Sequence, residues 1–217
     1  MFSFKPKKTE VVEPKFNQDL EIISQMNQEF ALSLDLNETL QTALKVIIQR
    51  INAKAANVFL IDDKKKLFEC IASVGQNYLE EYSIPITDGV MGKSVAQKKC
   101  IRVGDVRKDV REIAEFYFDL DNKTNFTTYS VLCAPLIAAN ECIGVIHCLN
   151  KKSENNLFEE EDRNLLETLA APAAFAIRNA KMAKEMIEQN KTQKEIEIVG
   201  EIQQSLLSNC LLYTSPS

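Results

Sequence analysis

The sequence predicts an α+β fold in which an antiparallel sheet is covered by helices on both sides. Apolar residues recur at three- and four-residue steps in some segments and gather in short β-prone runs in others. These segments follow one another as helix, helix, hairpin, helix, strand, helix, two strands and a long helix, an order that favours antiparallel pairing of neighbouring strands. With 217 residues, 45% hydrophobic and 26% charged, the chain suits one domain with helical extensions.

The N-terminal part is predicted to be a tail followed by a helix. Residues 1–15 contain two prolines and several lysines without periodicity, so we expect a mobile tail. Residues 16–35 are predicted to form a helix that needs a partner, because one stripe of it is apolar. That stripe consists of Phe16, Leu20, Ile23, Met26, Phe30 and Leu34.

The next elements form the predicted domain. A helix ending near Asn52 buries Leu40, Leu44, Ile47, Ile48 and Ile51, and the β-prone runs 57–61 and 67–72 form a hairpin around the polar loop 62–66. Residues 84–86 lead into a glycine-bearing turn at 87–92 that feeds a short helix through Lys99. Strands at 100–103, 130–137 and 141–150 then alternate with helices at about 109–122 and from 158 nearly to 207. Pro172 predicts a bend of the last helix at 170–173.

The charged C-terminal helix carries a predicted dimer seam. Between Arg178 and Glu201, five basic and five acidic residues intermix. An apolar seam interrupted by Asn190 and Lys194 predicts a weak two-stranded coil, and a solvated single helix is the alternative. The seam consists of Ile177, Ala180, Ile187, Ile198, Ile202 and Leu206.

Charge and hydropathy exclude several classes of function. The 26 basic and 31 acidic residues give a net charge of −5, which disfavours binding to nucleic acid or to an anionic membrane surface. No apolar run is long enough for a signal peptide or a membrane span, so we expect a cytoplasmic protein. The segment Gly92-Lys93-Ser94 lacks the upstream glycine of a phosphate-binding loop.

The cysteines predict core residues rather than a metal or disulfide site. None forms a C-x-x-C pair, and Cys70, Cys100, Cys133, Cys142 and Cys148 lie in strand-like apolar runs. Residues 210–217 match the translation of a transposase adapter used in sequencing libraries. We therefore expect the natural protein to be longer and exclude these eight residues from the fold prediction.

The strand sequences resemble the GAF domain family. The resemblance rests on the segments 129–137, 143–151 and 158–162, together with Asp88-Gly89-Val90-Met91-Gly92 and Val103-Gly104-Asp105-Val106, and covers about 36–180. It implies a GAF/PAS-like sheet, with helices on both faces, in a sensor that binds small molecules between the sheet and overlying helices. Asn150, Lys151, Phe158 and Asp162 match a signature of the cyclic-nucleotide subset, which implies that Lys151 pairs with Asp162, whereas Arg163 departs from it.

Four polar residues with helical spacing are candidate ligand contacts. If their segment is helical, Tyr117, Asp121, Thr124 and Thr128 line one face, where they offer a ring, a carboxylate and two hydroxyls. This set resembles the nucleotide-contacting segment of cyclic-nucleotide GAF domains. In the alternative interpretation, Thr124 caps a helix and Thr128 starts a strand.

The same resemblance implies further pocket positions: Asn57, Ser73, His147, Val90 and Met91. Val90 and Met91 would supply backbone contacts or apolar walls. Ser73 stands where related pockets carry an acid, so the choice of purine stays open. His147, the single histidine, is expected to be a core or pocket-wall residue rather than a metal or haem ligand.

The C-terminal segment 194–207 is similar to the helix that leads into SpoIIE/RsbU-like PPM phosphatase domains, and this similarity makes 181–209 a signalling linker. The chain is thus predicted to be a non-catalytic sensor with cyclic AMP or cyclic GMP as its candidate ligand. It is expected to regulate a serine/threonine phosphatase and to dimerise in parallel through Phe16–Leu34 and Ile177–Leu206. The alternatives are a ligand-free dimerisation module and a free methionine sulfoxide reductase, which needs a low-pKa thiol.

Overall fold

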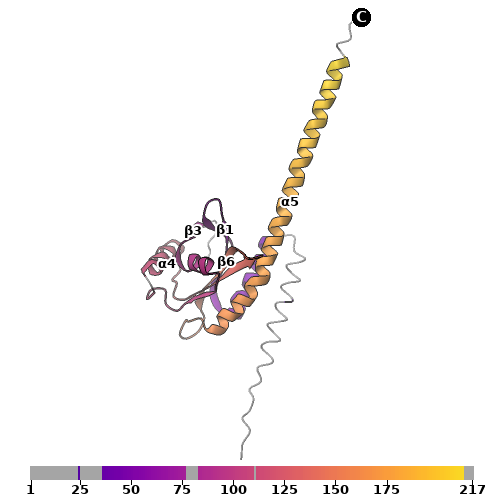
Figure 1. The fold of residues 1–217 in the computed structure, drawn as a ribbon. Coiled ribbons are helices and arrows are strands. Elements are labelled where there is room, and N and C mark those ends of the chain that lie inside the picture. The colour runs from indigo at the N-terminus through magenta and orange to yellow at the C-terminus, as the bar shows by residue number, and fades with distance from the viewer. Residues whose placement is uncertain (1–23, 25–35, 77–82, 110, 213–217) are drawn as a thin grey trace, which may run out of the picture. The chain divides into compact units, whose positions relative to one another are not determined.

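The computed structural model describes residues 24, 36–76, 83–109 and 111–212, so the predicted tail and nearly all of the helix predicted at 16–35 lie outside the described residues. The described elements confirm the α+β fold (Figure 1). In chain order they are α2 (Leu36–Ile51), β1 (Ala53–Asp62), β2 (Leu67–Gly75), β3 (Ser83–Pro85), α3 (Gly89–Gln97), β4 (Ile101–Val103), α4 (Arg111–Thr124), β5 (Val131–Ala138), β6 (Glu141–Lys151) and α5 (Glu160–Leu212).

The strands form one six-stranded antiparallel sheet in the order β3-β2-β1-β6-β5-β4. The predicted hairpin pairs β1 with β2. Its turn closes without glycine because Asp62 Oδ1 accepts hydrogen bonds from the N–H groups of Lys64 and Lys65 at 2.9 and 3.0 Å, and Lys66 takes a left-handed φ of 58°. Pro85 lies on β3 at the edge of the sheet, where a missing N–H is tolerated.

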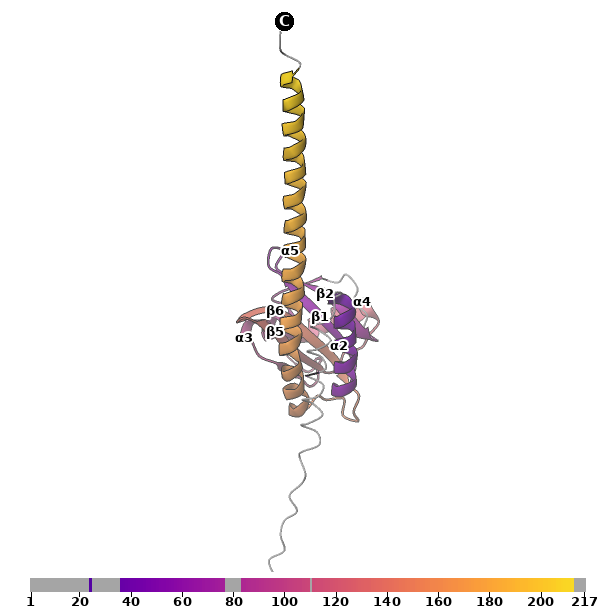
Figure 2. The ribbon, with the colours of Figure 1, turned by 90° about the vertical axis from the view of Figure 1, so that its right-hand side faces the viewer.

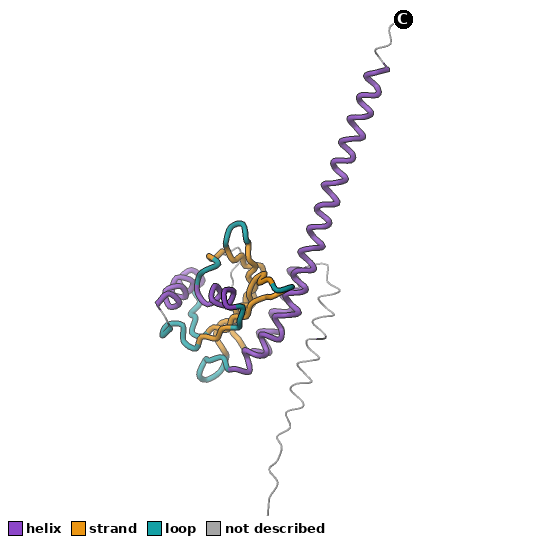
Figure 3. The backbone as a smooth tube through the Cα atoms, viewed as in Figure 1, coloured by secondary structure: helices purple, strands orange, loops and turns teal. Residues whose placement is uncertain are grey.

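Helices cover both faces of the sheet, and each face has its own apolar core (Figure 3). On one face, α2 lies beside the first part of α5 (Figure 2). Their buried side chains pack against the strands, and this core includes Leu44, Ile47, Ile146, Leu166 and Ile177. The other face is covered by α3 and α4 and includes Phe59, Met91, Val145, Tyr117 and Leu120.

Helix α5 neither ends nor restarts at Pro172. The residues around the proline keep a helical face against the sheet, with Leu169, Ala173 and Ile177 buried, and this packing offsets the missing backbone hydrogen bond. The compact unit ends at Ile177, and Arg178–Ser217 form a second unit. There the seam residues Ile187, Ile198 and Ile202 are 69%, 56% and 54% exposed. In the described part of the chain, no helix is apolar over enough residues to span a membrane.

Candidate functional site

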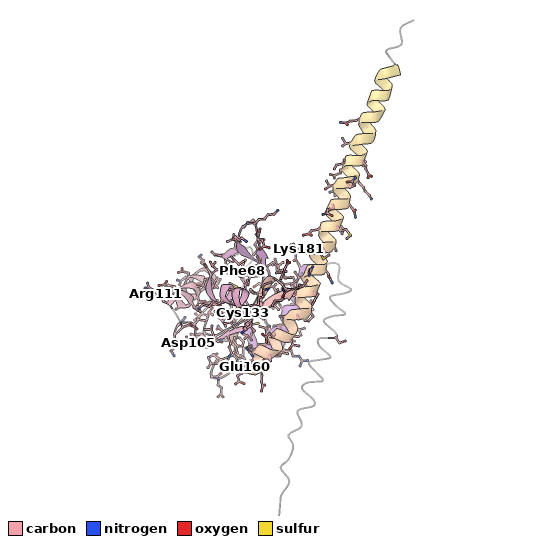
Figure 4. All side chains as sticks on the ribbon, in the orientation of Figure 1. Phe68, Asp105, Arg111, Cys133, Glu160 and Lys181 are labelled. Atoms are coloured by element: carbon pink, nitrogen blue, oxygen red, sulfur yellow. The ribbon has the colours of Figure 1, made fainter. Side chains whose placement is uncertain are left out.

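A row of polar side chains crosses the sheet on the face that α3 and α4 cover. Asn57 on β1 is paired with Ser73 on β2 and with His147 on β6, and His147 is paired with Cys133 on β5. Residues directly opposite each other on neighbouring strands point to the same face, so these four side chains form a continuous row. Figure 4 labels Cys133 near the middle of the compact unit. We call these residues the polar row.

The polar row is buried in an otherwise apolar core. Asn57 and His147 are fully buried and Ser73 is 5% exposed. The Ser73 hydroxyl donates a hydrogen bond to Asn57 Oδ1 at 2.6 Å. Burial lowers the pKa of His147 to about 3, so its imidazole is neutral near pH 7. The row therefore offers hydrogen bonds but no charge.

Helix α4 closes over the row through Tyr117. The hydroxyl of Tyr117 and Nε2 of His147 share a hydrogen bond of 2.8 Å, and the two rings stack with centroids 5.9 Å apart. Burial raises the pKa of the Tyr117 phenol well above its usual value, so the phenol keeps its proton.

The other ring nitrogen, His147 Nδ1, is buried and has no hydrogen-bond partner among the residues that the structure describes. Nδ1 is a donor when Tyr117 donates to Nε2, and an acceptor when Nε2–H donates to the phenol. An unpaired nitrogen in an apolar core costs about 1–3 kcal/mol. A ligand that supplies the missing hydrogen bond would recover this free energy.

The helical face predicted to run from Tyr117 to Thr128 is wrong in its last part. Helix α4 ends at Thr124, and Asn125 follows with a left-handed φ of 53°. The chain then turns back, so that Thr128 reaches Asp121 from a loop. One carboxylate oxygen of Asp121 accepts from the Thr128 hydroxyl at 2.6 Å and the other accepts from the Thr128 N–H at 2.8 Å.

Thr124 does not join this group. Its hydroxyl donates to the carbonyl oxygen of Leu120, one turn back in the same helix, at 2.9 Å. Val90 and Met91, at the start of α3, are fully buried in the apolar core of this face and form a wall. A Cβ on Gly89 would lie 2.8 Å from Phe116 Cδ1, and the left-handed φ of 60° at Gly89 is one that other residues rarely adopt, so glycine suits the start of α3 beside α4.

A hollow of about 570 Å³ flanks α4. Of the predicted contact residues, Tyr117, Asp121 and Thr128 line it, whereas Thr124, Val90, Met91 and the polar row do not. A second hollow of about 530 Å³ lies on the other flank, between α4 and the segment from Ser83 to Gly89. Tyr117 thus separates the first hollow from the polar row. A ligand that reaches the row has to displace the Tyr117 ring.

Asn150, the first of the signature residues, forms hydrogen bonds with the segment that presents Thr128. Asn150 Oδ1 accepts from the N–H groups of Tyr129 and Ser130 at 2.7 and 3.2 Å, and its amide donates to the Thr127 carbonyl at 2.6 Å. The sequence did not indicate this role, because the contacts join residues twenty or more positions apart.

A buried ion pair ties β6 to the start of α5. Lys151 Nζ lies 2.5 Å from Asp162 Oδ1 and donates to the Ile51 carbonyl at 2.7 Å, and the other Asp162 oxygen accepts from the Glu159 N–H at 2.8 Å. Phe158 is buried in the core beneath α2 and α5. Arg163, where the signature has an acid, pairs with Glu160.

The thiols lie in surroundings that keep them protonated. Burial raises the pKa of Cys70 and Cys100 to about 12, and burial also raises the pKa of Cys133 well above its usual value. Thiolate chemistry, which a sulfoxide reductase requires, is therefore not favoured at these cysteines. No group of three or more His, Cys, Asp or Glu side chains within the described ranges could hold a metal ion.

A family model for the GAF domain matches residues 33–178. The chain belongs to the GAF domain family. It is 25% identical over 200 residues to the dual 3',5'-cyclic-AMP and -GMP phosphodiesterase 11A of Takifugu rubripes, an alignment that covers 87% of this chain and 22% of that protein. It is 27% identical to the cGMP-specific 3',5'-cyclic phosphodiesterase of Drosophila melanogaster, with 58% of this chain and 11% of that protein covered. The chain thus spans about a fifth or less of these relatives.

Solved structures of other proteins share the fold. The GAF domain of an Acinetobacter phosphoenolpyruvate-protein phosphotransferase superposes with a TM-score of 0.63 at 19% identity, covering 76% of this chain and 96% of that chain. The free methionine-R-sulfoxide reductase of Neisseria meningitidis gives 0.62 at 22% identity, covering 80% and 96%. The GAF domain described here is a sensor module.

The buried histidine makes the stability of this GAF domain depend on pH. The pKa of His147 is about 3 in the folded chain, against about 6.5 when unfolded, so the unfolded chain binds the extra proton between these values. We expect the free energy of unfolding to fall by about 2 kcal/mol between pH 8 and pH 5, before most carboxylates titrate. Urea unfolding at several pH values measures this slope, which His147→Gln should lack. An imidazole that titrates near pH 6.5 in the folded protein would contradict it.

Proposed function

We propose that this GAF domain senses a cyclic nucleotide that binds beneath α4. The observation that carries the proposal is the unpaired nitrogen of buried His147 within a row of neutral polar side chains. Such a row suits an uncharged heterocycle with hydrogen-bonding edges, as in a purine base. Tyr117, Asp121 and Thr128 line the neighbouring hollow, whose volume of about 570 Å³ is in the range of small-molecule pockets.

The relatives support this choice of ligand class. The two phosphodiesterases named above act on cyclic nucleotides, and the similarity of one covers 87% of this chain. Asn57, Ser73, His147, Val90 and Met91 remain proposed pocket residues alongside those that line the hollow, whereas Thr124, whose hydroxyl is bonded within its own helix, is not proposed as a ligand contact. Ser73 carries no charge where related pockets carry an acid. The polar row therefore has no carboxylate at this position that could discriminate between cyclic AMP and cyclic GMP.

Ligand binding is proposed to act through the helices that flank the domain. A parallel homodimer through Phe16–Leu34 and Ile177–Leu206 would place two copies of α5 together, and the exposed side chains of Ile187, Ile198 and Ile202 are consistent with a partner. The output would be a SpoIIE/RsbU-like PPM phosphatase domain joined after 181–209. Each tenfold preference of the ligand for one helix arrangement supplies about 1.4 kcal/mol.

Isothermal titration with cyclic AMP and cyclic GMP tests the binding function, and two threonines give a matched pair of variants. We expect heat with at least one nucleotide. Thr128→Ala, which removes a hydroxyl at the hollow, should weaken binding at least about tenfold. Thr124→Ala removes a hydroxyl that is bonded within its own helix and should change the Kd by less than about threefold. Folded protein that gives no heat with either nucleotide would leave the ligand-free dimerisation module as the better description.

A further inference from the structure

We propose that Arg107 binds the negatively charged part of the ligand at the edge of the first hollow, the one that Tyr117, Asp121 and Thr128 line, and that this ligand carries a single negative charge. The inference rests on the cyclic-nucleotide function proposed above. It adds the orientation of the ligand and its charge class. Arg107 was not among the residues that the sequence indicated, because it lies in the segment between β4 and α4, remote in sequence from Thr128.

The structure fixes the backbone of Arg107 beside the hollow. Its N–H donates to Asp105 Oδ1 at 3.1 Å, and the preceding residue, Val106, is buried and donates its N–H to the Tyr129 carbonyl at 2.8 Å. Arg107 lines the same hollow as Tyr117, Asp121 and Thr128. Figure 4 labels Asp105 and Arg111, which lie on either side of Arg107 in the sequence.

The guanidinium is positioned but not neutralised. Its central carbon lies 5.0 Å from the centroid of the Tyr129 ring, a cation–π contact that restricts the side chain and leaves its N–H groups for other partners. Arg107 forms no ion pair within 4 Å with any described residue, and the neighbouring carboxylate of Asp105 pairs with Lys108 at 3.2 Å. A guanidinium held in this way can bind a phosphate oxygen with charge-assisted hydrogen bonds.

The carboxylates around the hollow limit the charge of the ligand. Glu115 is paired with Arg111, and both oxygens of Asp121 accept hydrogen bonds from Thr128. Among the described residues, the lining thus contains three carboxylates, Glu115, Asp119 and Asp121, and one cation, Arg107. Counting Arg111, which pairs with Glu115 from outside the lining, leaves an excess of one negative charge. A ligand with one negative charge can form charge-assisted hydrogen bonds with the guanidinium at close range. A second negative charge on the ligand would be repelled by the two aspartates.

The neutral polar row determines the orientation of the ligand in this proposal. Asn57, Ser73 and the uncharged His147 have no cationic group to offer an anion, and a buried anion without one is costly. The uncharged base therefore lies toward the row and the anionic group toward Arg107. Cyclic mononucleotides, with one phosphodiester charge, meet both requirements. Nucleoside 5'-monophosphates, which carry nearly two charges at pH 7, do not.

Calorimetry on the full chain tests the role of Arg107, with Lys108→Gln as the matched control. Lys108 is adjacent and 84% exposed, and it does not line the hollow. We expect Arg107→Gln to weaken binding of the cyclic nucleotide by about 10- to 100-fold, Arg107→Lys to restore part of the loss, and Lys108→Gln to change the Kd by less than about threefold. Wild-type protein should bind 5'-AMP or 5'-GMP at least about tenfold more weakly than the matching cyclic nucleotide.

Two results would overturn this inference and leave the proposed function intact. The first is an Arg107→Gln variant that binds the cyclic nucleotide with the same Kd as the wild-type protein. The second is wild-type protein that binds 5'-monophosphates as tightly as cyclic nucleotides. Wild-type protein that binds no cyclic nucleotide would overturn both the function and the inference. The melting temperature of each variant, measured in the same buffer, separates a loss of binding from a loss of folding.

Discussion

Asp162→Ala is expected to lower the free energy of unfolding by about 3 kcal/mol, the cost of leaving one member of a buried ion pair without its partner. The side chains of Lys151 and Asp162 are only 16% and 11% exposed, so water cannot replace the lost contact fully. The substitution also removes the acceptor for the Glu159 N–H at the start of α5. Thermal unfolding should show a melting temperature lower by about 6–12 °C.

Glu160→Ala is the matched control for this prediction. Glu160 lies in the same first turn of α5, so both substitutions lose the same kind of interaction with the helix dipole. Its ion pair with Arg163 is much more exposed, at 58% and 37%, and should contribute less than about 1 kcal/mol. Equal destabilisation by the two substitutions would show that the buried pair does not hold α5 to β6. The double variant Lys151→Met/Asp162→Leu should be more stable than Asp162→Ala, because neither charge is left unpaired.

Asp121→Ala should reduce both stability and ligand binding. It leaves the buried hydroxyl and the N–H of Thr128 without their acceptor, which should cost about 2 kcal/mol of unfolding free energy. The segment that presents Thr128 to the hollow then loses its link to α4, so we expect binding of the cyclic nucleotide to weaken at least about tenfold. Urea unfolding and calorimetry on the same sample measure the two effects.

Asp119→Ala is the control for Asp121→Ala. Asp119 lies on the same helix and lines the same hollow, but it is exposed and forms no hydrogen bond or ion pair within the described residues. We expect wild-type stability and binding that is equal or slightly tighter, since one repulsive charge is gone. If Asp121→Ala matched Asp119→Ala in both measurements, the Asp121–Thr128 contact would have no part in the site.

The fold could be predicted from the sequence because each element carries a strong local pattern. β1, β5 and β6 coincide with apolar β-prone runs to within a few residues, and the hairpin closes at the predicted polar loop 62–66, although the turn that Asp62 forms there was not predicted. The end of α4 lies within two residues of its predicted end, but the position of Thr128 could not be predicted in the same way. A spacing of four, three and four residues continues a helical face as far as Thr128, but Asn125 ends the helix first.

The candidate site was only partly visible in the sequence, since its geometry depends on long-range contacts. Tyr117 and His147 were both indicated, but their hydrogen bond arises only when α4 folds over β6. Asn150 forms hydrogen bonds with the segment before β5, and Arg107 lies over the ring of Tyr129. Each of these contacts joins residues about twenty positions apart. No periodicity encodes such pairs, so they follow from the tertiary structure alone.

Nuclear magnetic resonance of the single histidine tests most directly whether the ligand binds beneath α4. With ¹⁵N-labelled histidine, the Nδ1 signal of His147 reports the hydrogen bond that this nitrogen lacks in the described structure. At a cyclic nucleotide concentration that saturates the calorimetric signal, we expect the Nδ1 resonance to shift as the bond forms and the Nε2 resonance to change as Tyr117 moves. Saturated protein in which both resonances stay at their ligand-free positions would contradict a ligand site at the polar row.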